Sequence, residues 1–205
     1  MLSHLVDHVI ERCTRPGDTV LDPFGGFGTT ADRAVALGRL ACAVELLPER
    51  VLHIRHHVPS ALVVEGDARE LLRLVAMHDV PHPVDLILTS PPYMTATHDD
   101  ADPLTGYEEG DGDYGRYLHE LGLVAAQCAR VLRPGGFLVW NVADIRHRGH
   151  TTRLIADCSR VLRTHLVARG RTEIVWDHYP HDLVADALLV FQANATSGAK
   201  NATRR

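Results

Sequence analysis

A short stretch, Ser90-Pro91-Pro92-Tyr93, has residue types that could perform chemistry. It follows an apolar run at residues 84–88, which predicts a buried strand. The two prolines end that strand, because neither has an N–H to donate to a neighbour. A hydroxyl, a rigid backbone and an aromatic ring thus come at the carboxyl end of a strand, where open α/β sheets bind ligands. Alone, these residues could equally be a stiffened strand exit with a surface tyrosine.

A glycine-rich loop, Asp22-Pro23-Phe24-Gly25-Gly26-Phe27-Gly28-Thr29-Thr30, follows an earlier apolar run at residues 19–21. Its glycines allow a tight turn and a close approach of the backbone to a ligand. The spacing differs from the G-x-G-x-x-G pattern of dinucleotide-binding loops, which disfavours NAD as the ligand.

Two acidic residues end the next two apolar runs: Glu45, 17 residues past Gly28, and Asp67, with Ala68 beside it. A carboxylate at such a strand end can accept both ribose hydroxyls of a nucleoside. Separately, Glu45 could be a solvated strand end and Asp67 a helix N-cap. Together with the glycine loop, and followed by Ser90, they indicate a nucleoside site next to a reaction site.

The elements that must position these residues alternate between strand and helix. Expected helices cover residues 2–13, 29–37, 48–57, 69–77, 117–132 and 152–166; expected strands cover 19–21, 40–44, 61–64, 84–88, 137–140, 172–176 and 184–192. The alternation predicts a Rossmann-like α/β fold, with a mostly parallel seven-stranded sheet and helices on both faces. The last two strands are expected to form an antiparallel pair. We expect one domain over residues 1–192 and a polar tail over 193–205.

Composition excludes several classes of protein. The chain has 205 residues and is 45% hydrophobic, which suits one sizeable core. Its four cysteines contain no C-x-x-C pair, so they are expected to be reduced thiols in a cytoplasmic protein. No apolar run approaches the roughly 20 residues of a membrane span. Three histidines, His53, His56 and His57, are expected to be solvated, and no metal site is predicted.

Charge is distributed unevenly, although the net charge of −5 does not mark the whole chain as a nucleic-acid binder. Residues 95–113 hold seven acids and no Lys or Arg, in a loop long enough to be a lid. Residues 130–171 hold nine arginines and two acids. Three of these arginines, Arg146, Arg148 and Arg153, follow the fifth strand, so they could contact phosphates flanking a bound base. A merely solvated basic face is the alternative.

With both motifs in hand, the chain resembles the S-adenosylmethionine-dependent amino-methyltransferases of DNA, which make N4-methylcytosine or N6-methyladenine. The stretch 22–30 is similar to their D-P-F-x-G-x-G-T-T cofactor loop, and Ser90-Pro91-Pro92-Tyr93 to their catalytic motif. Residues 141–144 are a weaker match to an N-x-(G/A)-D stretch. The resemblance covers roughly residues 2–192 and implies the family's methyltransferase fold, S-adenosyl-L-methionine as cofactor, and DNA modification such as that of restriction-modification systems.

The resemblance also implies roles for individual residues. The expected cofactor-binding residues are Asp22, Phe24, Gly26, Gly28, Thr29, Glu45, Asp67 and Ala68, with Glu45 on the ribose and Asp67 on the adenine amino group. The expected catalytic residues are Ser90, Pro91, Pro92 and Tyr93. The Ser90 hydroxyl and the Pro91 carbonyl would accept hydrogen bonds from an exocyclic amine, orienting it towards the methyl group. Tyr93 would stack on a base turned out of the duplex, and Trp176 could form a second wall or be a core tryptophan.

Several alternatives concern the substrate. Ser at the first motif position favours cytosine N4 over adenine N6 within the resembling family. RNA is a second possible substrate, because related N-P-P-Y and D-P-P-Y sites methylate RNA bases. No target-recognition domain is visible, so the protein could have low sequence specificity or need a partner subunit or a second copy. A cofactor-binding accessory subunit is the non-enzyme alternative, which the intact Ser90-Pro91-Pro92-Tyr93 motif disfavours.

Overall fold

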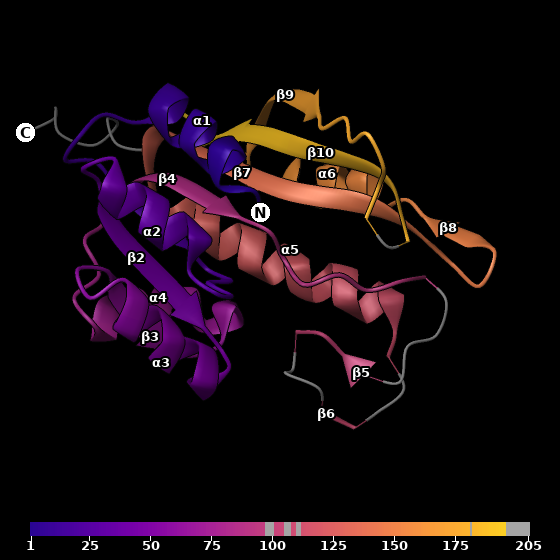
Figure 1. Ribbon diagram of the computed structural model, residues 1–205, viewed down its shortest axis with the longest axis horizontal. Helices are drawn as coiled ribbons and strands as arrows, with labels where there is room; N and C mark the ends of the chain where they lie inside the picture. Colours follow the sequence, from indigo (N-terminus) through magenta and orange to yellow (C-terminus); the bar gives the residue numbers. More distant parts are fainter. Residues whose placement is uncertain (97–100, 105–107, 110–111, 181, 196–205) are drawn as a thin grey trace, which may run out of the picture.

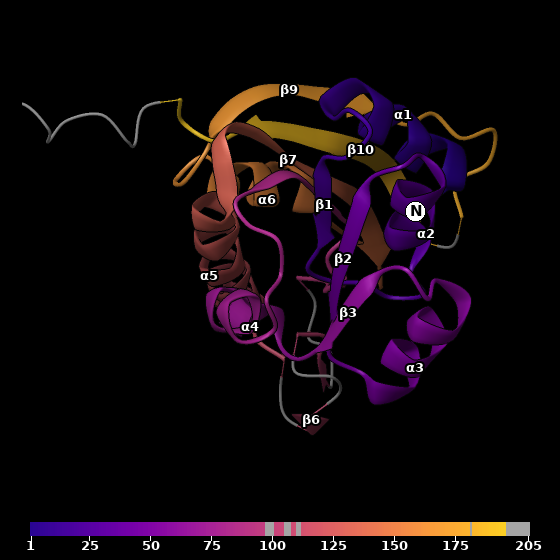
Figure 2. The same cartoon turned by 90° about the vertical axis from the view of Figure 1, so that its left-hand side faces the viewer.

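A computed structural model describes residues 1–96, 101–104, 108–109, 112–180 and 182–195, and shows one large sheet between two layers of helices (Figures 1 and 2). The helices are α1 (Ser3–Cys13), α2 (Thr29–Ala36), α3 (Pro48–His57), α4 (Leu71–Met77), α5 (Tyr114–Val131) and α6 (Leu154–Leu162). A short 3-10 helix, η1 (Ala68–Glu70), leads into α4. The strands are β1 (Thr19–Asp22), β2 (Leu40–Glu45), β3 (Leu62–Glu65), β4 (Val84–Thr89), β7 (Leu132–His147), β8 (His150–Thr152), β9 (Val167–Glu173) and β10 (Leu183–Gln192), with the small pair β5 (Ala101–Asp102) and β6 (Glu108–Glu109).

The strands of the large sheet lie in the order β3-β2-β1-β4-β7-β10-β9, and β8 pairs with β7. The pairs from β3 across to β7 are parallel, whereas β10 is antiparallel to both β7 and β9. The chain reverses its direction of strand addition at β1, whose neighbours are β2 and β4. This arrangement confirms the predicted α/β fold, including the antiparallel pairing of the last two strands, β9 and β10.

Two hydrophobic layers hold the helices to the sheet, one on each face. Strand residues alternate between them: Leu21 and Ile87 join the layer under α4, α5 and α6, whereas Val20 and Leu86 join the layer under α1, α2 and α3. Figure 2 shows these two groups of helices on opposite sides of the strands. The alternation follows from the two-residue period of a strand, which presents successive side chains to opposite faces.

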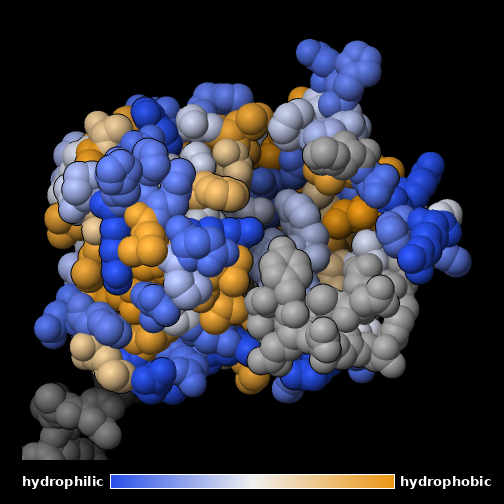
Figure 3. Space-filling model, turned by 60° about the horizontal axis from the view of Figure 1, so that its bottom comes forward, coloured by the Kyte–Doolittle hydropathy of each residue, from blue (hydrophilic) through white to orange (hydrophobic). Residues whose placement is uncertain are grey.

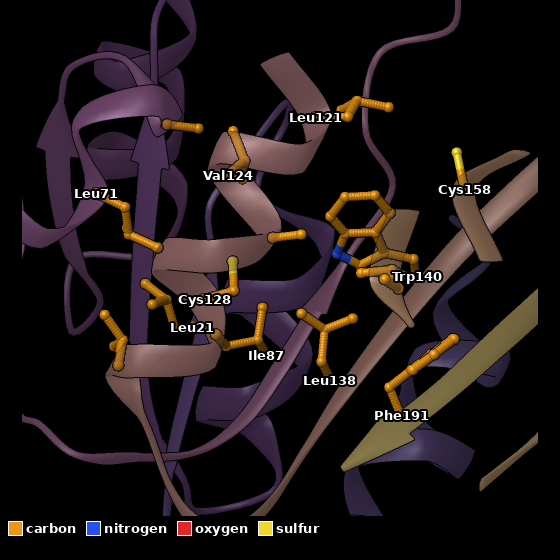
Figure 4. Close-up of a cluster of buried hydrophobic side chains, with 14 of the residues drawn as sticks. Leu21, Leu71, Ile87, Leu121, Val124, Cys128, Leu138, Trp140, Cys158 and Phe191 are labelled. Atoms are coloured by element: carbon orange, nitrogen blue, oxygen red, sulfur yellow. The ribbon is translucent and has the colours of Figure 1, made fainter. Parts of the chain in front are cut away.

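The largest buried side chain is Trp140 of β7, which is fully enclosed. Figure 4 shows its indole among Leu121 of α5, Leu138 of β7 and Cys158 of α6. All four cysteines are free. Burial raises the pKa of Cys42 to about 11 and that of Cys128 and Cys158 to about 12, so these three thiols stay protonated near neutral pH.

Strand β7 is much longer than the predicted strand at 137–140. Its early part, between the predicted helix and the predicted strand, contains an irregularity: Val84 pairs with Leu132, and Leu86 already pairs with Phe137. Its far end continues past Trp140, because Asn141 to Ile145 pair with β10. The polar residues Asn141 and Asp144 looked like a strand end in the sequence, yet their side chains find partners within the fold.

Beyond Ile145, β7 turns back into β8, a strand that the sequence did not predict. The turn is Arg148-Gly149, with φ values of 48° and 81°. Two positive φ values in a two-residue loop fit the twist of a hairpin, and Asn-Gly is the usual signal for them. Arginine replaces that signal here, so residues 152–153 were assigned to a helix that in fact begins at Leu154.

Two more predictions concern the carboxyl-terminal tail and membrane-spanning segments. The polar tail was expected from residue 193, but Ala193 is still buried and exchanges backbone hydrogen bonds with Gly135 and Gly136. The rest of the predicted tail, from residue 196, lies outside the described residues. Within the described part of the chain, no helix combines the length and the hydrophobicity needed to cross a membrane.

Candidate active site at the carboxyl edge of the sheet

A pocket of about 160 Å³ lies where β1, β2, β3 and β4 end. The segments following all four strands contribute to it, together with two residues of the long acidic loop. Its lining residues are Pro23, Phe24, Gly26, Glu45, Leu46, Leu47, Arg50, Gly66, Asp67, Ala68, Ser90, Pro92, Pro103 and Leu104. The glycine loop, both strand-end acids and the Ser-Pro-Pro motif therefore meet around one cavity, although they are far apart in the sequence.

Glycine is required at two positions of the loop. Gly26 has a φ of 55°, in the left-handed region, where side chains with a Cβ are disfavoured. Gly28 has a φ of 85°, and a Cβ there would lie 3.1 Å from the side chain of Ile54 in α3. Gly28 therefore lets α2 begin close to α3, while Gly26 brings the backbone up to the pocket.

Glu45 is buried at the wall of the pocket and is held by backbone amides. Its Oε2 accepts a hydrogen bond from Gly26 N at 2.6 Å, and its Oε1 accepts one from Leu47 N at 3.0 Å, at the start of α3. Each carboxylate oxygen can accept a further hydrogen bond. The side chain is therefore fixed in position and still able to receive hydroxyl donors from a ligand.

Asp67 is engaged by a residue that the sequence did not single out, Arg69. The Asp67 carboxylate accepts hydrogen bonds from Arg69 N at 2.8 Å and from Arg69 Nη2 at 2.6 Å. Arg69 Nη1 also donates to Glu120 Oε2 of α5 at 2.9 Å. Asp67 raises the pKa of Arg69, so the guanidinium stays charged. The acid after β3 is thus tied through Arg69 to α5.

Asp22 lies behind the pocket wall and joins the glycine loop to the Ser-Pro-Pro motif. Its Oδ1 accepts a hydrogen bond from Thr89 Oγ1 at 2.5 Å and one from Phe24 N at 3.0 Å. Burial raises the pKa of Asp22 to about 6; its hydrogen bonds oppose the rise and the nearby Glu45 charge adds to it. Thr89 is fully buried beside Ser90 and is a positioning residue that the sequence reading missed.

The predicted cofactor residues thus fall into two groups. Phe24, Gly26, Glu45, Asp67 and Ala68 line the pocket. The other three, which are Asp22, Gly28 and Thr29, support the loop and the start of α2 from behind that lining.

The predicted catalytic residues border the same pocket through Ser90 and Pro92. The Ser90 and Tyr93 hydroxyl oxygens are 3.4 Å apart. Tyr117 of α5, which is almost fully buried, donates from its hydroxyl to the Pro92 carbonyl at 2.8 Å. Burial raises the pKa of Tyr93, so its phenol is neutral at physiological pH. The motif is therefore held in place by α5 as well as by β4. In the sequence, Tyr117 was visible only as an aromatic residue on an amphipathic helix.

Trp176 is held at the end of β7 by a buried carboxylate. Asp186 of β10 accepts a hydrogen bond from Trp176 Nε1 at 2.9 Å and another from Asn141 Nδ2 at 2.6 Å. Asn141 directly follows Trp140, which pairs with Thr89, so this group lies next to the strand that leads into Ser90. Trp176 is half-buried, and Asp186 was not among the predicted site residues.

Arg146, Arg148 and Arg153 are exposed and lie on or just after the β7–β8 hairpin. The hairpin reaches out at the right of Figure 1, and strongly hydrophilic residues lie at the corresponding edge of Figure 3. The structure therefore groups these arginines on and just after one projecting element, and none of them lines the pocket.

The acidic loop is only partly described. Pro103 and Leu104 close one side of the pocket, and Leu104 is buried. Asp113 caps α5 by accepting a hydrogen bond from Gly115 N at 2.7 Å. The side chains of the other acids in this loop, which we expected to turn outward from a lid, lie outside the described part of the structure.

The three clustered histidines behave as a surface stack. The rings of His53 and His57 lie 4.0 Å apart, and Phe27 contacts His53 edge-on. Among the described residues, no group of three or more His, Cys, Asp or Glu is arranged to hold a metal ion.

Comparison with known proteins agrees with this geometry. A family model described as DNA methylase matches residues 3–55 and 84–186. TrmN from Thermus thermophilus is 22% identical with a TM-score of 0.66, over 94% of this chain and 48% of that structure, so the chain spans about half of its length. A TehB-like SAM-dependent methyltransferase from Corynebacterium glutamicum is 17% identical, with a TM-score of 0.60 over 92% of this chain and 87% of that one. The N-methyltransferase NodS from Bradyrhizobium japonicum is 12% identical, with a TM-score of 0.63 and 94% of both chains covered. At these identities the three structures show a shared fold.

The pocket suits S-adenosylmethionine. Glu45 offers acceptor oxygens for a ribose, Phe24, Leu47 and Leu104 offer apolar walls, and Gly26 lets the backbone approach the ligand. The cofactor is therefore S-adenosylmethionine, and the chain is a methyltransferase that belongs to the N6/N4 DNA methylase family.

Proposed function

We propose that this protein transfers a methyl group from S-adenosylmethionine to an exocyclic amino group of a base in DNA, with cytosine N4 favoured over adenine N6. One observation carries the proposal: Glu45 and Asp67, the acids suited to the cofactor, share a pocket with Ser90 and Pro92 of the reaction motif. A methyl donor bound to the acids would thus lie beside acceptors for an amine.

Bound S-adenosylmethionine supplies an activated methyl group. In the proposed reaction, the Ser90 hydroxyl and the Pro91 carbonyl accept hydrogen bonds from the amine of the target base. These contacts direct the nitrogen lone pair at the methyl carbon. Methyl transfer would form a nitrogen–carbon bond and break the carbon–sulfur bond of the cofactor, and the nitrogen would lose one proton to water. The chain contributes mainly by positioning, so the fixed backbone of the motif matters as much as its side chains.

Tyr93 and Trp176 are proposed to hold the base after it leaves the helical stack. Tyr93 is half-buried and close to Ser90, and Trp176 is anchored by Asp186. Aromatic rings replace the stacking energy that a base loses on leaving its neighbours, worth about 1–3 kcal/mol per base. Residues 1–192 would form the catalytic domain that performs this reaction.

The DNA assignment is supported by the family description, and the preference for cytosine by the serine at the first position of the motif. The test is methyl transfer by purified protein to DNA and to RNA, with isotopically labelled cofactor and mass spectrometry of the nucleosides. We expect the wild type to produce labelled N4-methylcytosine in DNA. A Ser90→Ala variant that still binds cofactor should produce at least a hundredfold less of it. Label in RNA bases only would contradict the DNA substrate, and undiminished transfer by the variant would contradict the role of Ser90.

A further inference from the structure

The hairpin formed by β7 and β8 is a separate arm at the edge of the site. Beyond Ile145, β7 pairs with β8, in the register Arg146 with Thr151 and His147 with His150, and Arg146 also makes a backbone hydrogen bond to Asp182. Figure 1 shows this arm projecting past the other strands of the sheet. A two-stranded ribbon that leaves its sheet gains no stability from a core of its own, so its exposure calls for another explanation.

The base of the arm is firmly held. Thr152 is buried, and its hydroxyl accepts a hydrogen bond from Ala96 N at 2.7 Å. Asp144 accepts one from Ile155 N at 2.9 Å, and Arg146 N donates to the Asp182 carbonyl at 2.8 Å. Ala96 lies six residues after Ser90, so the arm is attached to the chain segment that leaves the reaction motif.

The arm and its base carry exposed positive charge, and the charged group that acts on Arg153 is Asp144. Arg146, Arg148 and Arg153 are exposed, as is His150. None of the three arginines forms an ion pair with a residue that the structure describes. The tip, Arg148-Gly149, is therefore a solvated cation at the end of a narrow ribbon.

The reach of the arm can be compared with the repeat of a duplex. Seven residues separate Asn141, beside the reaction motif, from Arg148. At about 3.3 Å per strand residue the tip lies roughly 23 Å away along the strand. With about 3.4 Å per base along one DNA strand, this corresponds to about six or seven base steps.

We propose that the β7–β8 arm lies in the major groove of duplex DNA and contacts bases several steps from the target, with Arg148 at the contact. This inference rests on the proposed DNA methylation. The major groove of B-form DNA admits a two-stranded ribbon, and arginine pairs with guanine O6 and N7 there. The major groove of A-form RNA is too narrow and deep for side chains to read. The arm would then supply the target recognition for which the sequence shows no separate domain.

The experiment compares duplex and single-stranded oligonucleotides that contain the same target base. The variant is Arg146→Ala with Arg148→Ala. The matched control is Arg130→Ala with Arg163→Ala, which removes the same charge from the last turn of α5 and from the residue just after α6, at the opposite edge of the sheet. The expected result is at least a tenfold rise in the KM for duplex, a rise below threefold for single strands, and no more than a twofold change in the control.

A second measurement separates groove contact from phosphate contact. Guanines in the duplex are replaced one at a time by 7-deazaguanine, which lacks the N7 acceptor. Replacement at a position about six or seven steps from the target should weaken methylation by the wild type. The same replacement should leave methylation by an Arg148→Ala variant unaffected. Equal losses on duplex and single strands, or no sensitive position, would overturn groove binding. If the wild type methylates DNA in the same assay, the proposed function is supported even when the proposal for the arm fails.

Discussion

Replacing Asp22 by asparagine tests the reasoning about the buried link between the glycine loop and β4. A rise in pKa from an ordinary 3.8 to about 6 means that folded protein takes up a proton more readily than unfolded protein. The protonated acid therefore stabilises the fold at low pH, and this contribution is lost as the pH rises through about 6. Asparagine has the same shape and accepts from Thr89 and Phe24, but it does not titrate.

The magnitude follows from these two pKa values. The full contribution of Asp22 protonation to the free energy of unfolding is about 3 kcal/mol, because each tenfold change in proton affinity is worth about 1.36 kcal/mol. Between pH 7.5 and pH 5 about 1.4 kcal/mol of it is gained, because the unfolded acid is still ionised at pH 5. The wild type should therefore gain about 1.4 kcal/mol over Asp22→Asn across this range.

The assay is urea unfolding of both proteins at several pH values, with the free energy of unfolding compared at each. Other titrating groups are common to the two proteins, so they cancel in the difference. For a chain of this size the shift corresponds to about 3–6 °C in melting temperature. A difference between wild type and variant that stays constant from pH 7.5 to pH 5 would refute the assignment of a raised pKa to Asp22.

Three further substitutions test the pocket, the motif and the aromatic wall. Gly26→Leu should weaken cofactor binding at least tenfold by calorimetry, whereas Gly17→Leu, which is also at positive φ but away from the pocket, should not; equal affinities would contradict the assigned loop. Tyr117→Phe should lower kcat about tenfold by freeing the Pro92 carbonyl, with a Tyr114→Phe control within twofold, and an unchanged kcat would remove Tyr117 from the site. Trp176→Ala should raise the KM for DNA about tenfold and Trp176→Phe less, and an unaltered KM in both would make the tryptophan purely structural.

Much of the fold could be predicted because the sequence patterns that determine its helices and strands are local. Periodic apolar residues identified the six α-helices and six of the seven main strands, and the glycine and proline signals placed the ends of β1 and β4. The strand expected at 172–176 was misplaced, because β9 covers Val167–Glu173 and shares only residues 172–173 with it. Since the carboxyl ends of parallel strands share one edge of a sheet, Glu45, Asp67 and Ser90 could be expected to meet without knowledge of any contact.

Two of the residues that were missed depend on contacts between residues distant in sequence. Thr89 is informative only because Asp22 lies opposite it, and Asp186 only because Asn141 and Trp176 reach it. The β7–β8 arm was missed because an Arg-Gly turn lacks the usual asparagine. These residues position the predicted site, and their chemistry alone gave no reason to select them.

The most direct test of the central conclusion is nucleoside mass spectrometry of DNA and RNA from cells with the gene, without it, and with a Ser90→Ala copy. N4-methylcytosine should be present in DNA with the intact gene, absent without it, and absent with the Ser90→Ala copy. DNA with unchanged methylated bases in all three strains, accompanied by a change in RNA, would contradict the proposal that DNA is the substrate.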